Sequence, residues 1–341
     1  MRSWFLLGSL ATTMGMTFAC SADEPTTGGA VSSSSGAPSS SGNTSSGVVS
    51  SSSGAPSSSG NTSSGAVSSS SGAPSSSGNT SSGAAECAQL DVVLVVDDSA
   101  SMQGAQEKLA VAAPSLLAAL DAIGADGTPL DYRLAVTTTS RTVTLEVTPP
   151  LGSPISVQEQ GENGAFRARG TTPRRWLERA DATRAADLQA RVRVGESGAG
   201  TEMPLETARL ALTDRLADTN LGFRRPGVPL AMLIFTNEDD LSTRAERVRV
   251  VGGVHDPVDP LASYVADYDT IAGAGRWSLA ILAIPPDTPT CGENSVNATR
   301  LAELATSLGA RGSLSAFCAE DYTASLQSAV ALFRASCIQS Q

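Results

Sequence analysis

Lysine and histidine are almost absent from this chain. Among its 341 residues, Lys108 is the only lysine and His255 is the only histidine. No site built from several histidines can therefore form within one chain. A serine hydrolase would have to use His255 as its base, but that residue lies in the polar stretch 252–257, which we expect to be an exposed loop. We therefore do not expect an enzyme.

Basic side chains are also scarce. The chain carries 23 basic and 34 acidic side chains, and only Arg2, Asp23 and Glu24 precede residue 86. The remainder is strongly acidic, whereas binding to phosphates requires a basic surface. This balance argues against nucleic acid as a partner and against electrostatic attachment to anionic lipids.

Charged and aromatic residues are missing altogether from residues 26–85. Within this stretch, residues 31–84 repeat with a period of 18, and the three units begin at Val31, Val49 and Val67. Such a composition cannot bury enough apolar surface to offset chain entropy, so it predicts a flexible Ser/Gly-rich spacer. We expect a signal peptide at 1–19, the spacer at 20–86 and one folded domain at 87–341.

The amino terminus has the features of an export signal. Arg2 precedes a short apolar run at 4–16, which is too short for a permanent membrane span. Cys20 follows this run directly after a small residue and resembles the cysteine of a bacterial lipobox, although Thr17 and Phe18 depart from the usual pattern. We predict lipidation at Cys20 and a location in the cell envelope, at the outer membrane, with the lipid as the only membrane contact. Ordinary signal-peptidase cleavage nearby is the alternative.

The cysteine count fits this interpretation. If Cys20 is lipidated, an even number remains in an exported chain: Cys87, Cys291, Cys318 and Cys337. Three pairings are possible. We favour Cys87–Cys337 with Cys291–Cys318, because the first bridge would close the domain at its two ends. No CxxC spacing occurs, so a metal site made of cysteines is not expected.

Strands and helices alternate along the folded part. Apolar runs predict strands at 91–96, 132–138, 191–194, 230–235, 277–284 and 312–317. Helices are expected at 105–123, 174–180, 185–189, 204–216, 261–274, 297–308 and 323–337, and residues 142–190 are treated as an insertion. This order predicts an α/β fold in which a doubly wound, mostly parallel sheet is flanked by helices in three layers.

Oxygen-bearing side chains follow the ends of three predicted strands. The first loop contains Asp97, Ser99 and Ser101, and a second loop contains Thr201. The third loop, at 236–240, offers Asn237, Asp239 or Asp240. Ligands bind at the carboxyl ends of strands in such folds, and oxygen ligands favour Mg²⁺, Mn²⁺ or Ca²⁺ over zinc. The sequence therefore predicts a divalent-cation site at this edge.

Three motifs resemble the von Willebrand factor type A family. They read VVLVVDDSASM at 92–102, GAGTEMPLETA at 198–208 and LIFTNEDDLS at 233–242, and the resemblance covers roughly residues 87–337. It implies a Rossmann-like fold with a metal-ion-dependent adhesion site. In such a site serine and threonine hydroxyls hold the ion, aspartates supply charge, and a carboxylate of the partner fills an open coordination position.

Carried over residue by residue, the resemblance assigns Asp97, Ser99, Ser101 and Thr201 to the ion. The third loop departs from the family pattern, because Asn237 stands where an aspartate is usual. The site thereby loses one negative charge unless Asp239 or Asp240 bends in. We expect Asn237 or Asp239 to complete the ligand shell.

Two hypotheses follow. In the first, an anchored adhesion module binds a protein or glycan that offers a carboxylate, through a Mg²⁺, Mn²⁺ or Ca²⁺ ion. In the second, a structural envelope protein keeps the same scaffold with a degenerate, metal-free site.

Overall fold

The computed structural model describes residues 87–125, 128–292 and 295–339. The predicted signal peptide, the Cys20 anchor and the repeat spacer lie outside this part of the chain. The strands are β1 Gln89–Val96, β2 Gly124–Ala125, β3 Thr128–Pro129, β4 Asp131–Thr138, β5 Val143–Thr148, β6 Ile155–Glu159, β7 Trp176–Glu178, β8 Leu230–Phe235, β9 Arg247–Val251, β10 Val254–Asp256, β11 Trp277–Ala283 and β12 Gly312–Ala316. The α-helices are α1 Gln103–Asp121, α2 Arg184–Val192, α3 Pro204–Ala211, α4 Leu261–Ala272, α5 Thr299–Ser307 and α6 Thr323–Gln339.

A six-stranded sheet forms the centre of this part, in the order β12-β11-β8-β1-β4-β7. All neighbours are parallel except β7, which pairs antiparallel with β4 at the edge. If these six strands are renumbered 1 to 6 in chain order and the sheet is read from β7, the order is 3-2-1-4-5-6, which is the doubly wound arrangement. The predicted fold class is confirmed. In such a sheet the strand order reverses between β1 and β8, and the crevice for ligands opens at that point.

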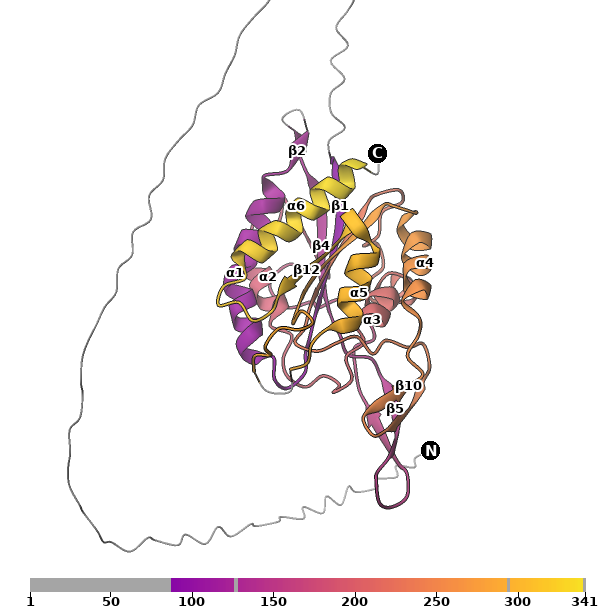
Figure 1. Cartoon of the computed structure of the whole chain (residues 1–341). Coiled ribbons are helices and arrows are strands. Elements are labelled where there is room, and N and C mark those ends of the chain that lie inside the picture. Colours follow the sequence, from indigo (N-terminus) through magenta and orange to yellow (C-terminus); the bar gives the residue numbers. More distant parts are fainter. Residues whose placement is uncertain (1–86, 126–127, 293–294, 340–341) are drawn as a thin grey trace, which may run out of the picture. The chain divides into compact units, whose positions relative to one another are not determined.

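Both faces of the sheet are buried, which gives three layers (Figure 1). In β1, Val92, Leu94 and Val96 belong to the core that contains α1, α2 and α6. Val93 and Val95 belong to the opposite core, which contains α3, α4 and α5. A strand buried on both sides needs apolar residues at every position, and this explains the unbroken run 92–96.

A second sheet stands beside the first, in the order β10-β9-β5-β6. Figure 1 shows its strands β5 and β10 beyond the edge of the central sheet at which β1 ends. Its small core joins Val143, Leu145 and Val248 to Met203, which directly precedes α3. Its strands are short and largely exposed, so the sequence did not reveal them.

The structure corrects several local predictions. Residues 176–178 form the edge strand β7 instead of a helix, and 191–192 end helix α2 instead of beginning a strand. The alternating Arg-Val-Arg-Val sequence favoured a strand, but Leu188 and Val192 lie four residues apart and pack into one core, which keeps the segment helical. His255 lies half-buried in β10, not in a loop. None of the described helices is long and apolar enough to cross a membrane.

Both favoured disulfides are present, Cys87–Cys337 and Cys291–Cys318. The first joins the residue that opens the described chain to the last helix, and both of its cysteines are buried in the core beside α1. Cys337 lies within α6, which extends two residues beyond the predicted helix end at 337. The first bridge therefore holds the amino edge of the sheet, and the second lies on loops near the opposite edge.

Candidate cation site

The end of β1 meets the end of β8 at the point where the strand order reverses. The backbone N–H of Asp97 donates to the Phe235 carbonyl at 2.9 Å, which joins the first loop to the third. One oxygen of the Asp97 carboxylate accepts the Ser99 N–H at 2.8 Å, and the other accepts the Thr236 hydroxyl at 2.7 Å. Asp97 is therefore held in place by neutral donors from both loops.

Asp97 is fully buried, at 0% exposure. Burial raises the pKa of its carboxyl, while the hydrogen bonds from Ser99 and Thr236 partly oppose this effect and the neighbouring Asp98 adds to it. No arginine or lysine of the described residues lies within ion-pair distance of it. A buried carboxylate without a cation is costly, so this site suits an external positive charge.

The two serines of the first loop differ in their contacts. The Ser99 hydroxyl is buried and has no hydrogen-bond partner among the described residues. The Ser101 hydroxyl accepts a hydrogen bond from the Asn237 side-chain amide at 3.0 Å. Asn237 thus links the first loop to the third. A buried hydroxyl without a protein partner is rare, so the Ser99 oxygen is available to an ion.

The second loop is fixed against the first by close backbone contacts. The Gly198 N–H donates to the Asp98 carbonyl at 2.8 Å, and the Ala199 N–H donates to the Ser140 hydroxyl at 2.7 Å. That hydroxyl donates in turn to the Asp98 carboxylate at 2.6 Å. A Cβ atom at Gly198 would lie 2.4 Å from the Asp98 carboxyl carbon, so only glycine allows the loops to approach this closely.

A hollow of about 510 Å³ opens between these loops, and Ser99, Ser101, Gly200 and Glu238 contribute to its walls. Thr201 follows Gly200 directly and is 2% exposed, and its hydroxyl makes no hydrogen bond within the described residues. The first loop, through Ser99 and Ser101, and the second loop, through Gly200, therefore line the same hollow. Its donor set consists of hydroxyl and carboxylate oxygens, which suits a hard divalent cation.

Two predicted third-loop carboxylates are engaged elsewhere. Asp239 accepts the backbone N–H groups of Arg300 at 2.8 Å and Leu301 at 3.1 Å, so it caps the start of α5. Asp240 is buried, forms an ion pair with Arg300 at 2.8 Å, and accepts the Leu205 N–H at 3.3 Å. These contacts argue against Asp239 as a ligand and leave Asn237 as the third-loop candidate.

Sequence reasoning missed two acidic side chains beside the site. Glu202 is fully buried, and burial, followed by the charges of Asp97 and other acids, raises its pKa well above the ordinary value. Burial and the charges of Asp97 and Glu159 raise the pKa of Glu238 to about 7. The only signal in the sequence was their position, since Glu202 follows Thr201 and Glu238 follows Asn237. Among the described residues, no three histidine, cysteine or carboxylate side chains form a ready metal-binding group.

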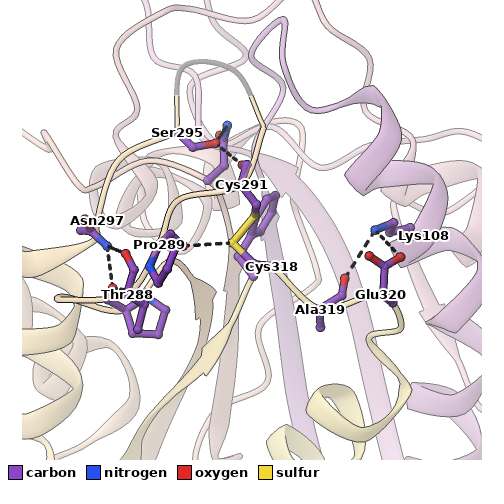
Figure 2. Close-up of a disulfide and its surroundings, with 12 residues drawn as sticks. Lys108, Thr288, Pro289, Cys291, Ser295, Asn297, Cys318, Ala319 and Glu320 are labelled. Atoms are coloured by element: carbon purple, nitrogen blue, oxygen red, sulfur yellow. Dashed lines mark hydrogen bonds and ion pairs between the residues drawn. A yellow bond between two sulfur atoms is a disulfide. The ribbon is translucent and has the colours of Figure 1, made fainter. Parts of the chain in front are cut away.

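The second disulfide lies at the rim of this region (Figure 2). It joins the loop after β11 to the residues after β12. Ser295 donates to the Cys291 carbonyl at 2.6 Å and accepts from Asn237 at 3.1 Å. Figure 2 also shows the side chain of Lys108 directed from α1 toward Ala319 and Glu320, next to the disulfide. The bridge thus restrains a loop that contacts the third-loop candidate ligand.

Comparison with known proteins gives limited matches. No known protein family and no curated protein matches the sequence. Among solved structures, proximal thread matrix protein 1 from the mussel byssus, with a zinc-occupied MIDAS motif, is 11% identical, with a TM-score of 0.36 over 73% of this chain and 48% of that one. The human COPII-coat protein Sec24c is 10% identical, with a TM-score of 0.36 over 70% of this chain and 30% of that one.

A third similar structure is the pilus adhesin SpaC from Lactobacillus rhamnosus GG. It is 13% identical, with a TM-score of 0.34 over 74% of this chain and 30% of that one. The chain therefore spans about half the length of the byssus protein and less of the other two. The fold assignment rests on this chain's own sheet order, not on these matches.

Proposed function

We propose that the folded domain binds a carboxylate-bearing protein or glycan through a divalent cation at the edge where β1 and β8 end. The observation that carries the proposal is the meeting of separate loops at one oxygen-lined hollow. Asp97 supplies charge, and Ser99, Ser101 and Thr201 supply hydroxyl oxygens. Asn237 contributes from the third loop.

The chemistry of the donor set supports this role. Hydroxyl and amide oxygens are neutral, so the ion would keep much of its positive charge. When bound, such an ion supplies an open coordination position that attracts an external carboxylate. The residues of this chain would hold and orient the ion, while the exposed neighbours Gly200 and Ala100 leave room for a partner.

A metal-free scaffold is the second candidate, and one contact favours it. The Asn237 amide donates to the Ser101 hydroxyl at 3.0 Å, so the third loop closes against the first without an ion. In this case the domain would serve as a structural part of the cell envelope.

Calorimetric titration of the purified chain with Mg²⁺ and Mn²⁺ separates the two candidates. The proposal expects saturable binding that is weakened at least about tenfold in Thr201→Val, because one oxygen ligand is lost. Thr207→Val is the matched control, since Thr207 is also buried but donates to the Pro204 carbonyl inside α3. No binding by the parent chain, or equal binding by Thr201→Val, would remove the cation-dependent function.

The envelope location is a separate part of the proposal. It rests on the export signal and on Cys20, which lie outside the described residues. Fractionation of cells producing the chain should place it with membranes, and Cys20→Ala should release it into the soluble fraction. Recovery of both proteins in the same fraction would count against a lipid anchor.

A further inference from the structure

Glu202 is a buried carboxylate that the fold leaves without a partner. It is 0% exposed, and neither of its carboxylate oxygens has a hydrogen-bond partner in the described part of the chain. Its backbone is fixed on two sides, because it forms a bridge with Ser140 and its carbonyl accepts the Leu241 N–H at 2.8 Å. The side chain therefore cannot easily move away to reach water.

The charged groups around Glu202 are themselves acidic. Asp97, Asp98 and Glu238 act on it, and each makes its ionised form less favourable. The Thr139 hydroxyl lies close enough to lower the pKa of Glu202 in part, although its hydrogen bond is donated to Asp98 at 3.4 Å. No arginine or lysine of the described residues pairs with Glu202. No basic side chain of the described residues therefore balances the ionised form of Glu202, and a cation bound nearby would favour that form.

Glu206 shows that the same segment is able to pair a buried glutamate. It is 1% exposed and receives two hydrogen bonds from the Arg209 guanidinium, at 2.9 and 2.8 Å. Its backbone N–H donates to Ser242 at 2.9 Å. The missing partner at Glu202 is therefore a feature of that position and not of the segment.

We propose that Glu202 supplies, next to Asp97, the negative charge that the site loses by having Asn237 in the third loop, and that it thereby stabilises a bound divalent cation. This inference rests on the proposed cation site. It differs from the ligand set that the sequence predicts, which contains no glutamate. The other nearby candidates for this charge, Asp239 and Asp240, are already engaged at α5 and Arg300.

The test compares Glu202→Gln with Glu206→Gln in the whole chain. Gln keeps the size of the side chain but removes its charge. We expect Glu202→Gln to weaken Mg²⁺ and Mn²⁺ binding at least about tenfold in calorimetry, since a negative charge that acts on the site through a region of low dielectric is lost. Glu206→Gln should bind as tightly as the parent chain.

Thermal unfolding without metal gives a second readout, in which the melting temperatures of the two variants should change in opposite directions. Glu202→Gln should raise the melting temperature by about 2–4 °C, because an unpaired carboxylate no longer has to be buried. Glu206→Gln should lower the melting temperature, because Arg209 loses its partner. A purely structural role of Glu202 would lower both stability and cation binding.

Restoring the charge elsewhere completes the test. In the Glu202→Gln background, Asn237→Asp should recover at least half of the lost binding free energy, because it returns one negative charge to the site. If the parent chain binds no divalent cation, the proposed function and this inference both fail. If the parent binds and Glu202→Gln binds equally well, or fails to fold, the role of Glu202 alone is overturned.

Discussion

A fully buried aspartate lies near each end of strand β1, and the two differ in whether a basic side chain balances their charge. Asp91, near its amino end, pairs with Arg224 at 2.7 Å and Arg225 at 2.8 Å. Asp97, after its carboxyl end, contacts only neutral donors and has acidic groups nearby. The same residue type in the same sheet therefore has its charge balanced at one edge and not at the other.

The difference separates a structural carboxylate from one that is available for a ligand. Pairing a buried carboxylate contributes to stability only while both partners are present, and the Asp91 network fits that role. At the other edge the fold tolerates unbalanced acidic groups, which is the pattern that the proposed cation site requires. Substitution of these carboxylates one at a time should change the free energy of unfolding to very different extents.

The largest effect is expected for Asp91→Asn. It leaves the buried side chain of Arg224 without a counter-charge and leaves that of Arg225 with only the exposed Asp131, so it should cost about 3–5 kcal/mol of unfolding free energy. Urea unfolding measures this loss. The control is Asp131→Asn, since Asp131 also contacts Arg225 at 2.7 Å but is exposed, and should cost less than about 1 kcal/mol. Equal losses in the two variants would show that burial does not distinguish these ion pairs.

A smaller effect is expected for Asp187→Asn, in the predicted insertion. Burial alone would raise the pKa of Asp187, but hydrogen bonds from Thr172 and Thr171 outweigh it and hold the pKa below its usual value. Since the carboxylate's pKa is lower in the folded state, its contribution is present above pH about 4 and is lost as the pH falls below that value. The variant should lose roughly 2 kcal/mol at pH 7.

Unfolding at pH 7 and at pH 3 checks the sign. The difference in stability between the parent chain and Asp187→Asn should be smaller at pH 3, because at that pH Asp187 of the unfolded parent takes up a proton that the folded parent does not. A difference that stays constant between the two pH values would mean that the loss comes from packing and not from charge.

The sequence predicted the central sheet closely, because its strands are buried on both faces. The run 230–235 matches β8 residue for residue, and 277–284 and 312–317 each miss their strand by one residue. The sheet of β5, β6, β9 and β10 was not predicted. Its strands are short and half-exposed, and β5 pairs with β9 about a hundred residues away, so no buried apolar run identifies them, although Gly252-Gly253 between β9 and β10 is a hairpin signal.

For the candidate site, the sequence predicted the loops better than the contacts. The first and third loops follow from where β1 and β8 end, and this places Asp97 and Asn237 near one another. Asp239 looked like a ligand because it lies in the same loop as Asn237, but its role at the start of α5 depends on a residue 61 positions later. Glu202 was missed because a glutamate in a sequence is normally expected to be exposed or to form an ion pair. Only the structure shows that its carboxylate is buried and has no basic partner among the described residues.

The smallest effect on unfolding is expected for Asp97→Asn. The asparagine oxygen can still accept the Ser99 N–H, and removing the buried charge offsets a weakened contact with Thr236, so metal-free stability should change by less than about 1 kcal/mol. Binding of Mg²⁺ should nevertheless fall below detection in calorimetry, because the principal charge of the site is gone. Urea unfolding without metal measures the stability, and a Mg²⁺ titration of the same preparation measures the binding. If Asp97→Asn is destabilised as strongly as Asp91→Asn while binding Mg²⁺ like the parent chain, Asp97 is a structural residue like Asp91 and not a cation ligand.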